Sequence, residues 1–194
     1  SQDFKMQAMK NIKLFLLVVL FAGGVFSCKK SFENPNAANE EDAFGSAEGM
    51  IRLIVGMKHR FAVNSSYGVG SVFNGITTCG FITREIDLRS GANPDFVQFN
   101  AGGCNIASNN GTLTDLWANC LLVNKNATDI LGNVYKVQDS GLKHSIQANA
   151  LLYKAMSMGT LALYWKDQPV NPGPNAKFIT REAALQNAIS LLRK

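Results

Sequence analysis

The chain has 194 residues, of which 46% are hydrophobic and 17% charged, so it can bury the core of one domain and is not a disordered polypeptide. Its formal net charge is +5, but Lys5, Lys10 and Lys13 stand against Asp3 within the first 27 residues, so the remainder carries only +3. No run of lysine and arginine is long enough to form a phosphate-binding stripe, so nucleic acid is excluded as an expected partner.

The N-terminal segment combines positive charge with a short apolar run. Met9 is a plausible translation start preceded by upstream residues, and Lys10 and Lys13 precede an apolar stretch at 14–25. That stretch is about a dozen residues long, whereas a membrane-spanning helix needs about 20, so its length is typical of a secretory signal. We therefore expect residues 1–27 to contain a signal peptide that is removed.

A cysteine follows the apolar run. Val25-Phe26-Ser27-Cys28 resembles a bacterial lipobox, in which the peptide is cut before the cysteine and the thiol is diacylated, although Phe26 stands where a smaller residue is usual. The new amine is acylated as well, and several acyl chains, palmitate among them, hold a protein on a membrane where a single chain would not. The pattern predicts Cys28 as the lipidated residue. The alternative is an ordinary signal peptide with a chance cysteine nearby.

A polar tether and a first helix are expected next. Residues 28–45 contain Pro35, several asparagines and an acidic cluster, a composition that argues against packing. Ser46 is a good N-cap, and the apolar residues after it recur at i, i+3, i+4, i+7 and i+11. This spacing predicts an amphipathic helix whose buried stripe consists of Met50, Leu53, Ile54, Met57 and Phe61.

Residues 64–111 lack such periodicity. They are dense in glycine, asparagine and serine, with phenylalanines dispersed among them, and we expect a long irregular excursion between the first and second helices. Within it, Glu85 and Asp87 are flanked by two arginines. This arrangement favours a surface charge cluster over an acid–base pair.

The second helix is expected over residues 113–134. Thr112 and Asp115 resemble a capping box at its start. Its interior contains three asparagines, which are unusual inside a helix and predict hydrogen bonds to neighbouring loops: Asn119, Asn124 and Asn126.

Two more helices follow. One spans 141–165 and is rich in small residues, which let another helix approach closely, and it ends before a proline-rich segment. Thr180 caps the last helix, whose apolar positions run to the end of the chain. Antiparallel helices without strands between them predict a mostly α fold, a tetratricopeptide-like helical array over residues 46–194.

Few residues of this chain suggest metal binding or catalysis. His59 and His144 have no ligand partner at i+3 or i+4, so both are expected to be solvated helix residues. Beyond the lipobox, Cys79, Cys104 and Cys120 are an odd number with spacings that match no metal motif. Export would permit one disulfide, but buried free thiols are the favoured interpretation, above all for Cys120. Because no catalytic or cofactor-binding constellation is found, the sequence predicts a binding protein rather than an enzyme.

Five segments of the chain carry motifs of one known family. "SCKKSFENPNA" and "SAEGMIRLIVGMKHRF" are followed by "LWANCLLVNKNATDIL", "IQANALLYKAMSMGTLALYWKDQPVNP" and "ITREAALQNAISLL". In this order they resemble the N-terminal part of the SusD/RagB family of outer-membrane glycan-binding lipoproteins. Three features depart from the family pattern: Lys154 replaces an arginine, "WKDQ" replaces "FGD" before Pro169, and the last helix lacks an obvious match to the family's aspartate. The resemblance covers residues 27–194, and because family members are much longer, it implies a truncated chain or an N-terminal part.

The resemblance implies a function for the whole protein. Members are cell-surface lipoproteins of the outer membrane that bind oligosaccharide, or peptide, and deliver it to a SusC-type TonB-dependent transporter. They are not enzymes and need no cofactor, and their helical repeats mainly face the transporter. The alternative is a helical-repeat envelope lipoprotein that acts as a scaffold for other proteins.

Sugar binding needs flat aromatic faces beside hydrogen-bonding side chains. The excursion offers residues of both kinds: Tyr67, Phe73, Asn74 and Asn93. Packing is the favoured interpretation of both aromatics, since an excursion needs a core of its own. Trp117 and Trp165 lie in or at the end of apolar helices and are also expected in the core. No ligand-contacting residue is therefore assigned from the sequence.

Overall fold

The computed structural model of the protein describes residues 40–63 and 70–194, which belong to one packed unit. This part of the chain is mostly α-helical, as predicted, and contains one two-stranded sheet. Its elements in chain order are α2 (Glu40–Phe44), α3 (Ala47–Ala62), α4 (Ser71–Ile82), α5 (Pro94–Ala101), the 3-10 turn η2 (Gly103–Asn105), α6 (Gly111–Asn133), the 3-10 turn η3 (Val134–Lys136), α7 (Ser140–Tyr164), β1 (Asp167–Pro169), β2 (Phe178–Thr180) and α8 (Arg181–Leu192).

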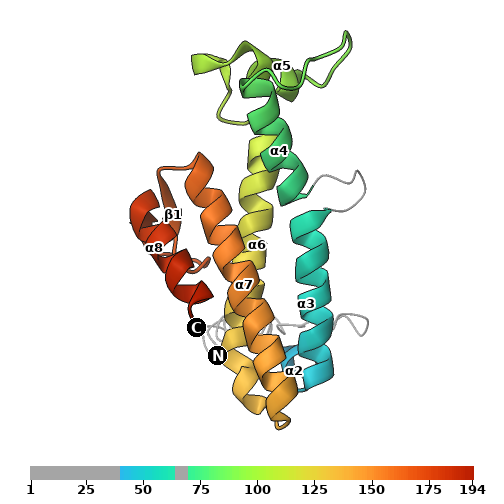
Figure 1. The fold of residues 1–194 in the computed structure, drawn as a ribbon, viewed down its shortest axis with the longest axis vertical. Coiled ribbons are helices and arrows are strands. Elements are labelled where there is room, and N and C mark those ends of the chain that lie inside the picture. Colours follow the sequence, from blue (N-terminus) through green and yellow to red (C-terminus); the bar gives the residue numbers. More distant parts are fainter. Residues whose placement is uncertain (1–39, 64–69) are drawn as a thin grey trace, which may run out of the picture. The chain divides into compact units, whose positions relative to one another are not determined.

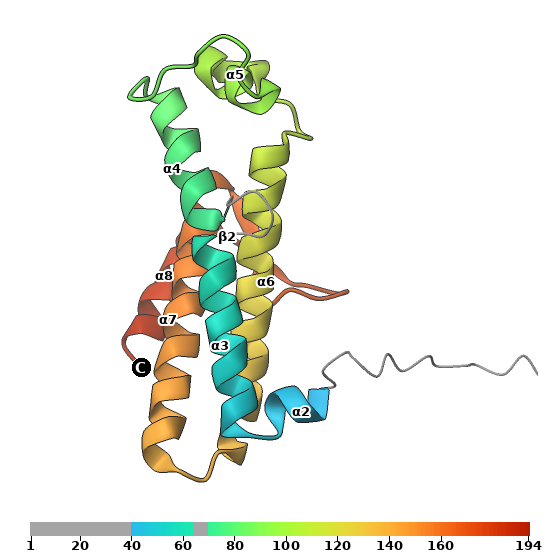
Figure 2. The same cartoon turned by 90° about the vertical axis from the view of Figure 1, so that its right-hand side faces the viewer.

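The hydrophobic core lies between three long helices. α6 packs along α7, and α3 packs against both of them (Figure 1, Figure 2). The stripe predicted on α3 faces this core, with Leu53 partly buried and its other four members buried. From α6 and α7 the core receives Leu116, Cys120, Val123, Ala127, Ile130, Ile146, Ala150 and Leu161. Full burial of one large apolar side chain stabilises a fold by about 1.5–3 kcal/mol, so this cluster holds the helices together.

Side-chain caps fix the starts of α3, α7 and α8. Ser46 accepts a hydrogen bond from the Gly49 N–H at 3.1 Å, and Thr180 accepts one from the Ala183 N–H at 3.4 Å, so both predicted N-caps are confirmed. Asp139 caps α7 by accepting from the Leu142 N–H at 2.7 Å. Each cap satisfies a backbone donor that the helix itself leaves without a partner.

The capping box predicted for α6 is wrong. The cap is Asn110, whose Oδ1 accepts from the Leu113 N–H at 3.2 Å, and Thr112 lies inside the first turn. The backbone N–H of Thr112 instead donates to Asp95 Oδ2 at 3.0 Å. Asn110 takes the capping place because its amide group also donates to the Asp95 carbonyl at 3.2 Å, a contact across the chain that a local motif cannot reveal.

Two segments of the expected irregular excursion are helical. α4 lies beside α6, and α5 packs at the far end of α4 (Figure 1, Figure 2). The rings of Phe81 and Phe96 meet there at 5.0 Å, and Phe99 is fully buried. α4 shows no clear apolar period because part of its buried face is polar: Ser71, Asn74 and Thr78 are all buried.

Two further segments are more ordered than predicted. The last residues of the expected polar tether form α2, and Phe44 packs against the core. Where only a proline-rich break was expected, β1 and β2 pair antiparallel with Gln168 opposite Ile179. Gln168 is buried and its Nε2 donates to the Met158 carbonyl at 2.8 Å, which ties the hairpin to α7.

α8 packs on α7 through small residues. Ala184 and Ala188 are buried, and Ala188 meets Ala155 and Met158 of α7. Of the larger apolar residues of α8, Leu191 packs against this cluster, whereas Leu185, Ile189 and Leu192 are exposed. The helix therefore approaches α7 closely on one side and leaves an apolar side open.

Candidate functional site

An uncharged hollow of about 480 Å3 lies where α6 begins and α7 ends. The loop before α6, the first turns of α6 and the residue after α7 form its walls. Its lining residues are Ile106, Ala107, Ser108, Leu113, Thr114, Trp117 and Trp165. Small-molecule sites commonly have volumes of about 300–1,000 Å3 with an apolar lining and a few polar groups, and this hollow has both properties.

Two tryptophans form the aromatic wall. The ring centroids of Trp117 and Trp165 are 5.0 Å apart and their planes are inclined by 62°, an edge-to-face contact. Tyr164 lies next to Trp165, with ring centroids 5.8 Å apart. Both tryptophans are half-buried and pack against the main core, so the expectation of core residues is met only in part. Edge-to-face contacts of this kind stabilise a ring pair by about 0.5–1.5 kcal/mol beyond the burial of its area.

The loop on the other side of the hollow is fixed by hydrogen bonds. Gln98 Oε1 of α5 accepts from the Ala107 N–H at 2.9 Å and from Asn110 Nδ2 at 3.2 Å. The Asn110 N–H in turn donates to the Ala107 carbonyl at 3.1 Å. The loop is thus held between α5 and α6, and the hollow is formed before any ligand arrives.

The polar groups of the hollow are hydroxyls. Thr114 Oγ1 donates to the Asn110 carbonyl at 2.9 Å, so its oxygen can still accept a hydrogen bond from a ligand. Ser108 is exposed at the rim. With no charged lining residue, the hollow offers nothing to neutralise a phosphate, sulfate or carboxylate.

The residues named from the sequence as possible sugar contacts do not gather in one place. Asn74 is fully buried and its Nδ2 donates to the Thr112 carbonyl at 3.2 Å, so it is part of the α4–α6 packing. Asn93 caps α5 by accepting from the Asp95 N–H at 2.9 Å. Phe73 is 42% exposed, so its predicted role in packing is wrong. Tyr67 and Cys28 lie outside the described residues.

The cysteines differ in their surroundings. Cys120 is a buried free thiol, as predicted, and burial raises its pKa to about 11, while a hydrogen bond to Ser71 opposes that rise. Cys79 is free but exposed, so the expectation of a buried thiol is wrong for it. The side chain of Cys104 lies outside the described residues.

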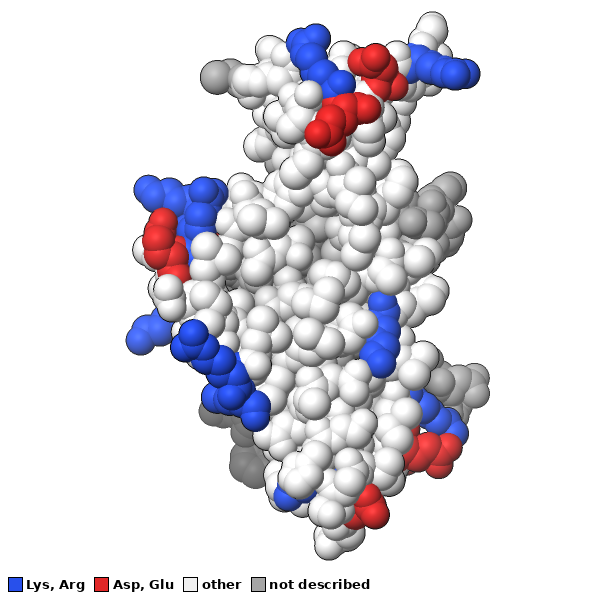
Figure 3. Space-filling view, in the orientation of Figure 1, with Lys and Arg blue, Asp and Glu red and all other residues white. Residues whose placement is uncertain are grey.

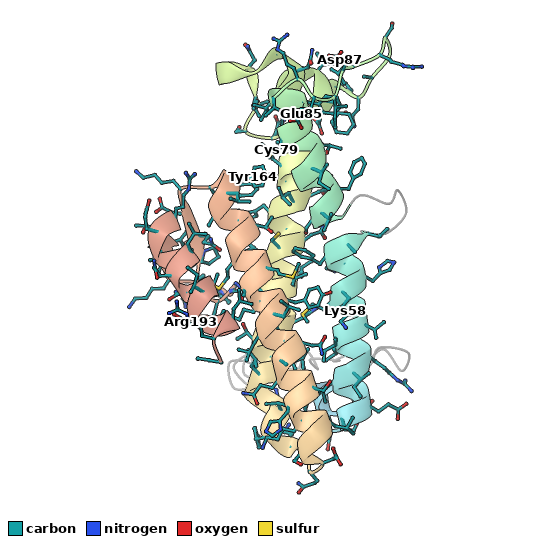
Figure 4. The ribbon with its side chains drawn as sticks, in the orientation of Figure 1. Lys58, Cys79, Glu85, Asp87, Tyr164 and Arg193 are labelled. Carbon is teal, nitrogen blue, oxygen red and sulfur yellow. The ribbon has the colours of Figure 1, made fainter. Side chains whose placement is uncertain are left out.

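Cys79 and Tyr164 join α4 to the end of α7. Their Sγ and Oη atoms are 3.1 Å apart, and the two side chains are labelled in Figure 4. Tyr164 Oη also donates to the Gly75 carbonyl at 2.8 Å. Burial, followed by the contact with Cys79, raises the pKa of the Tyr164 phenol, so the hydroxyl stays protonated and serves as a structural donor.

Lys154 anchors the loop of the β1–β2 hairpin. Its Nζ donates to Thr128 Oγ1 and to Asn171 Oδ1, both at 2.8 Å. Asn124 Nδ2 donates to the Val170 carbonyl at 3.2 Å, a hydrogen bond from the helix interior to a loop, as predicted. Burial lowers the pKa of Lys154, with a smaller contribution in the same direction from Lys194. This lysine therefore fastens the hairpin loop to α6 and α7.

The Asn119 side chain takes part in a different contact. Its Oδ1 accepts from Arg60 Nη1 at 3.2 Å, so it reaches α3 rather than a loop. His59 and His144 are both exposed helix residues, as predicted. Glu85 and Asp87 are also exposed, beyond the end of α4 (Figure 4).

Among the described residues, no group of three or more histidine, cysteine, aspartate and glutamate side chains could hold a metal ion. None of the described helices is long and apolar enough to cross a membrane. A second hollow, of about 610 Å3, lies between α2 and the start of α3, and its walls include the carboxylates Glu41, Asp42 and Glu48. Glu48 pairs with Arg52 there, so that hollow is a charged surface and lacks an aromatic wall.

The exposed side of α7 forms a long surface without charge. Lys154 is the one charged residue between 145 and 165, and it turns toward the hairpin. Figure 3 shows this surface as a broad uncharged area, and Figure 4 places Lys58 of α3 on one side of it and Arg193 on the other. Its exposed residues include Ser145, Ala148, Leu152, Met156 and Leu163, and we call these five the α7 face.

None of the family models, curated proteins or solved structures compared with this chain matches it. The likeness to the SusD/RagB family therefore rests on the sequence motifs. The helical fold agrees with that family but does not distinguish it from other helical arrays.

Proposed function

We propose that this protein is a lipid-anchored protein of an outer-membrane surface that captures a glycan or peptide and delivers it to a SusC-type TonB-dependent transporter. Cys28 carries the lipid in this proposal, and the described helices form the part that meets the transporter. The lipobox pattern at 25–28 and the order of the family motifs support the proposal from the sequence.

The observation that carries the proposal is the α7 face. Leu152, Met156 and Leu163 are 42%, 39% and 71% exposed, and no exposed charge lies between them along α7. The fully buried centres of protein–protein interfaces are depleted in charge and enriched in methionine and aromatic residues, while their rims are polar. The α7 face is likewise uncharged and contains Met156, although it has no aromatic residue, and cations lie on either side of it, so it fits a protein partner with an acidic rim.

The proposal is tested with the full chain produced in its native envelope. Labelled palmitate is expected on the wild-type protein and absent from Cys28→Ala, and the variant is expected to leave the outer-membrane fraction. After mild crosslinking, the wild-type protein is expected to co-purify with a TonB-dependent transporter. Retention of palmitate by Cys28→Ala, or a purified complex without any such transporter, would contradict the proposal.

The scaffold function remains the second candidate because the α7 face suits any protein partner. The two candidates differ in their dependence on nutrient. A capture protein is expected to bind an oligosaccharide or peptide with saturation and to appear beside one transporter. A scaffold is expected to co-purify with several envelope proteins and to bind neither ligand.

A further inference from the structure

The Trp117–Trp165 hollow has the properties of a site for a sugar ring. One face of a pyranose carries several C–H groups, and such a face packs on the π-surface of an aromatic ring, while its edge carries hydroxyls. In this hollow the aromatic wall meets the hydroxyl oxygen of Thr114 and the rim residue Ser108. Apolar and polar parts of the ligand would thus each find a partner.

The absence of charged residues from the lining of the hollow favours an uncharged ligand. All its lining residues are uncharged, and Arg181, which donates to the Trp165 carbonyl, is not among them, so an acidic sugar would lose water from its carboxylate without a cation in the lining to pair with. A neutral sugar has no such desolvation cost. The lining therefore favours neutral rings over uronic acids, sulfated sugars and nucleotides.

The hollow is also preorganised. Trp165 closes α7, with its N–H donating to the Leu161 carbonyl at 2.9 Å, and its own carbonyl accepts from Arg181 Nε at 3.4 Å. Gln98 holds the opposite loop through Ala107 and Asn110. A site whose walls are fixed in advance loses less entropy when it binds a ligand.

We propose that the Trp117–Trp165 hollow binds a neutral pyranose ring of an oligosaccharide. This inference rests on the proposed capture function and names the substrate class and the place where it is held. The proposal places the ligand where α6 begins and α7 ends, in contact with Trp117 and Trp165, which the sequence predicted to be core residues.

The chain offers a direct optical test, because Trp117 and Trp165 are its two tryptophans. The full chain is titrated with maltohexaose, cellohexaose, xylohexaose and mannohexaose while tryptophan emission is recorded, and with oligogalacturonate as the acidic comparison. We expect a saturable change of emission with at least one neutral oligosaccharide and none with oligogalacturonate. Binding to the same sugars is measured separately by calorimetry.

Two variants localise the response. Trp165→Leu keeps an apolar side chain against the core but removes the stacking surface, and is expected to weaken binding at least tenfold. Tyr135→Leu is the matched control, because it removes an exposed aromatic beyond the other end of α6, about 30 Å along the helix. Far-ultraviolet circular dichroism checks that both variants are folded. If Trp165→Leu does not fold, the change of tryptophan emission in the wild-type protein still tests the site.

The outcomes separate the site from the function. Calorimetric binding of a neutral sugar without a change of emission, or with Trp165→Leu unaffected, would overturn the hollow as the site and leave glycan capture standing. Preference for oligogalacturonate would overturn the neutral class. If no oligosaccharide of the panel binds, the result contradicts both the sugar site in the hollow and the proposed capture of glycans.

Discussion

At the scale of single residues, Asn110 does more than cap the helix that follows it, because its side chain also forms hydrogen bonds to α5. Its Oδ1 caps α6, and its Nδ2 donates to the Asp95 carbonyl and to Gln98 Oε1. Asn110 is 2% exposed, so water cannot replace these partners. One side chain thus joins α5, α6 and the loop that borders the tryptophan hollow.

We expect Asn110→Ala to lower the free energy of unfolding by about 2 kcal/mol. Loss of an N-cap costs about 0.5–2 kcal/mol, and the buried partners left without a hydrogen bond add to that loss. Urea denaturation followed by circular dichroism measures the change. Asn187→Ala, at an exposed site of α8, is the control and is expected to be close to neutral. Equal stability of the two variants would show that the Asn110 contacts contribute nothing.

Cys120 links stability to pH. Burial raises the pKa of its thiol from 9.0 to about 11, so the folded protein keeps the proton over a range in which the unfolded chain loses it. The stability that comes from the neutral buried thiol is therefore complete below pH 9 and is lost as pH rises toward 11.

We expect wild-type protein to lose on the order of 2 kcal/mol more stability than Cys120→Ala between pH 9 and pH 11. The measurement is a series of urea denaturations of both proteins across that range. Only the difference in slope matters, because the cavity left by the alanine lowers the stability of the variant at every pH. Parallel pH profiles would contradict the raised pKa.

At the scale of elements, the sequence predicted those helices whose buried side is apolar and whose caps are local. Ser46 and Thr180 are read directly from their own segments, and so is the stripe from Met50 to Phe61. α4 was missed because Asn74 and Thr78 occupy its buried side, and Asn74 donates to the Thr112 carbonyl of α6. The spacing of apolar residues within one segment cannot reveal a hydrogen-bond partner that lies on another helix.

The hollow was missed for the same reason. Trp117 and Trp165 are 48 positions apart, and only the packing of α6 on α7 brings their rings together. Each alone has the pattern of a core residue, and each does contact the core. Their shared surface follows from Gln98 and Asn110, which hold the facing loop away from the rings. Such an arrangement depends on four separate segments, and no spacing in the sequence encodes it.

The close packing of α8 on α7 provides a test at this scale. Ala188→Leu adds a larger side chain where Ala155 and Met158 leave little room, and overpacking of this kind costs about 1–3 kcal/mol. We expect faster proteolysis within α8 and a lower midpoint of thermal unfolding. Ile189→Ala, on the exposed side of the same helix, is expected to change either value little. Equal effects of the two variants would show that α8 is not held through its alanines.

At the scale of the whole molecule, the described helices carry two different surfaces at separate places. The tryptophan hollow lies where α6 begins and α7 ends. The α7 face follows α7 itself, which runs through the middle of the array (Figure 1). The hollow is concave and bounded by a fixed loop, which suits a small ligand. The face is long and uncharged, which suits a protein. A ligand and a partner could therefore be bound at once without competing for the same residues.

We expect the double variant Leu152→Arg and Met156→Arg to abolish co-purification of the partner while sugar binding persists. Both residues are exposed, so the substitutions are expected to change the free energy of unfolding by less than about 0.5 kcal/mol. Leu122→Arg, at an exposed position of α6, is the matched control. Loss of the partner from both variants would indicate a general effect of added charge, and retention in both would remove the α7 face as the docking surface.

The hairpin loop that Lys154 and Asn124 fasten has a practical consequence. The start of the loop is fixed at Val170 and Asn171, and the Val170 N–H donates to the Lys177 carbonyl at 3.0 Å across the base of the loop, whereas Gly173 and Pro174 at its tip are exposed. Exposed loop tips tolerate insertions well when the surrounding backbone is held. An epitope tag between Gly173 and Pro174 would thus label the protein without altering either terminus, and antibody staining of intact cells would then report whether the helices are accessible from outside the cell.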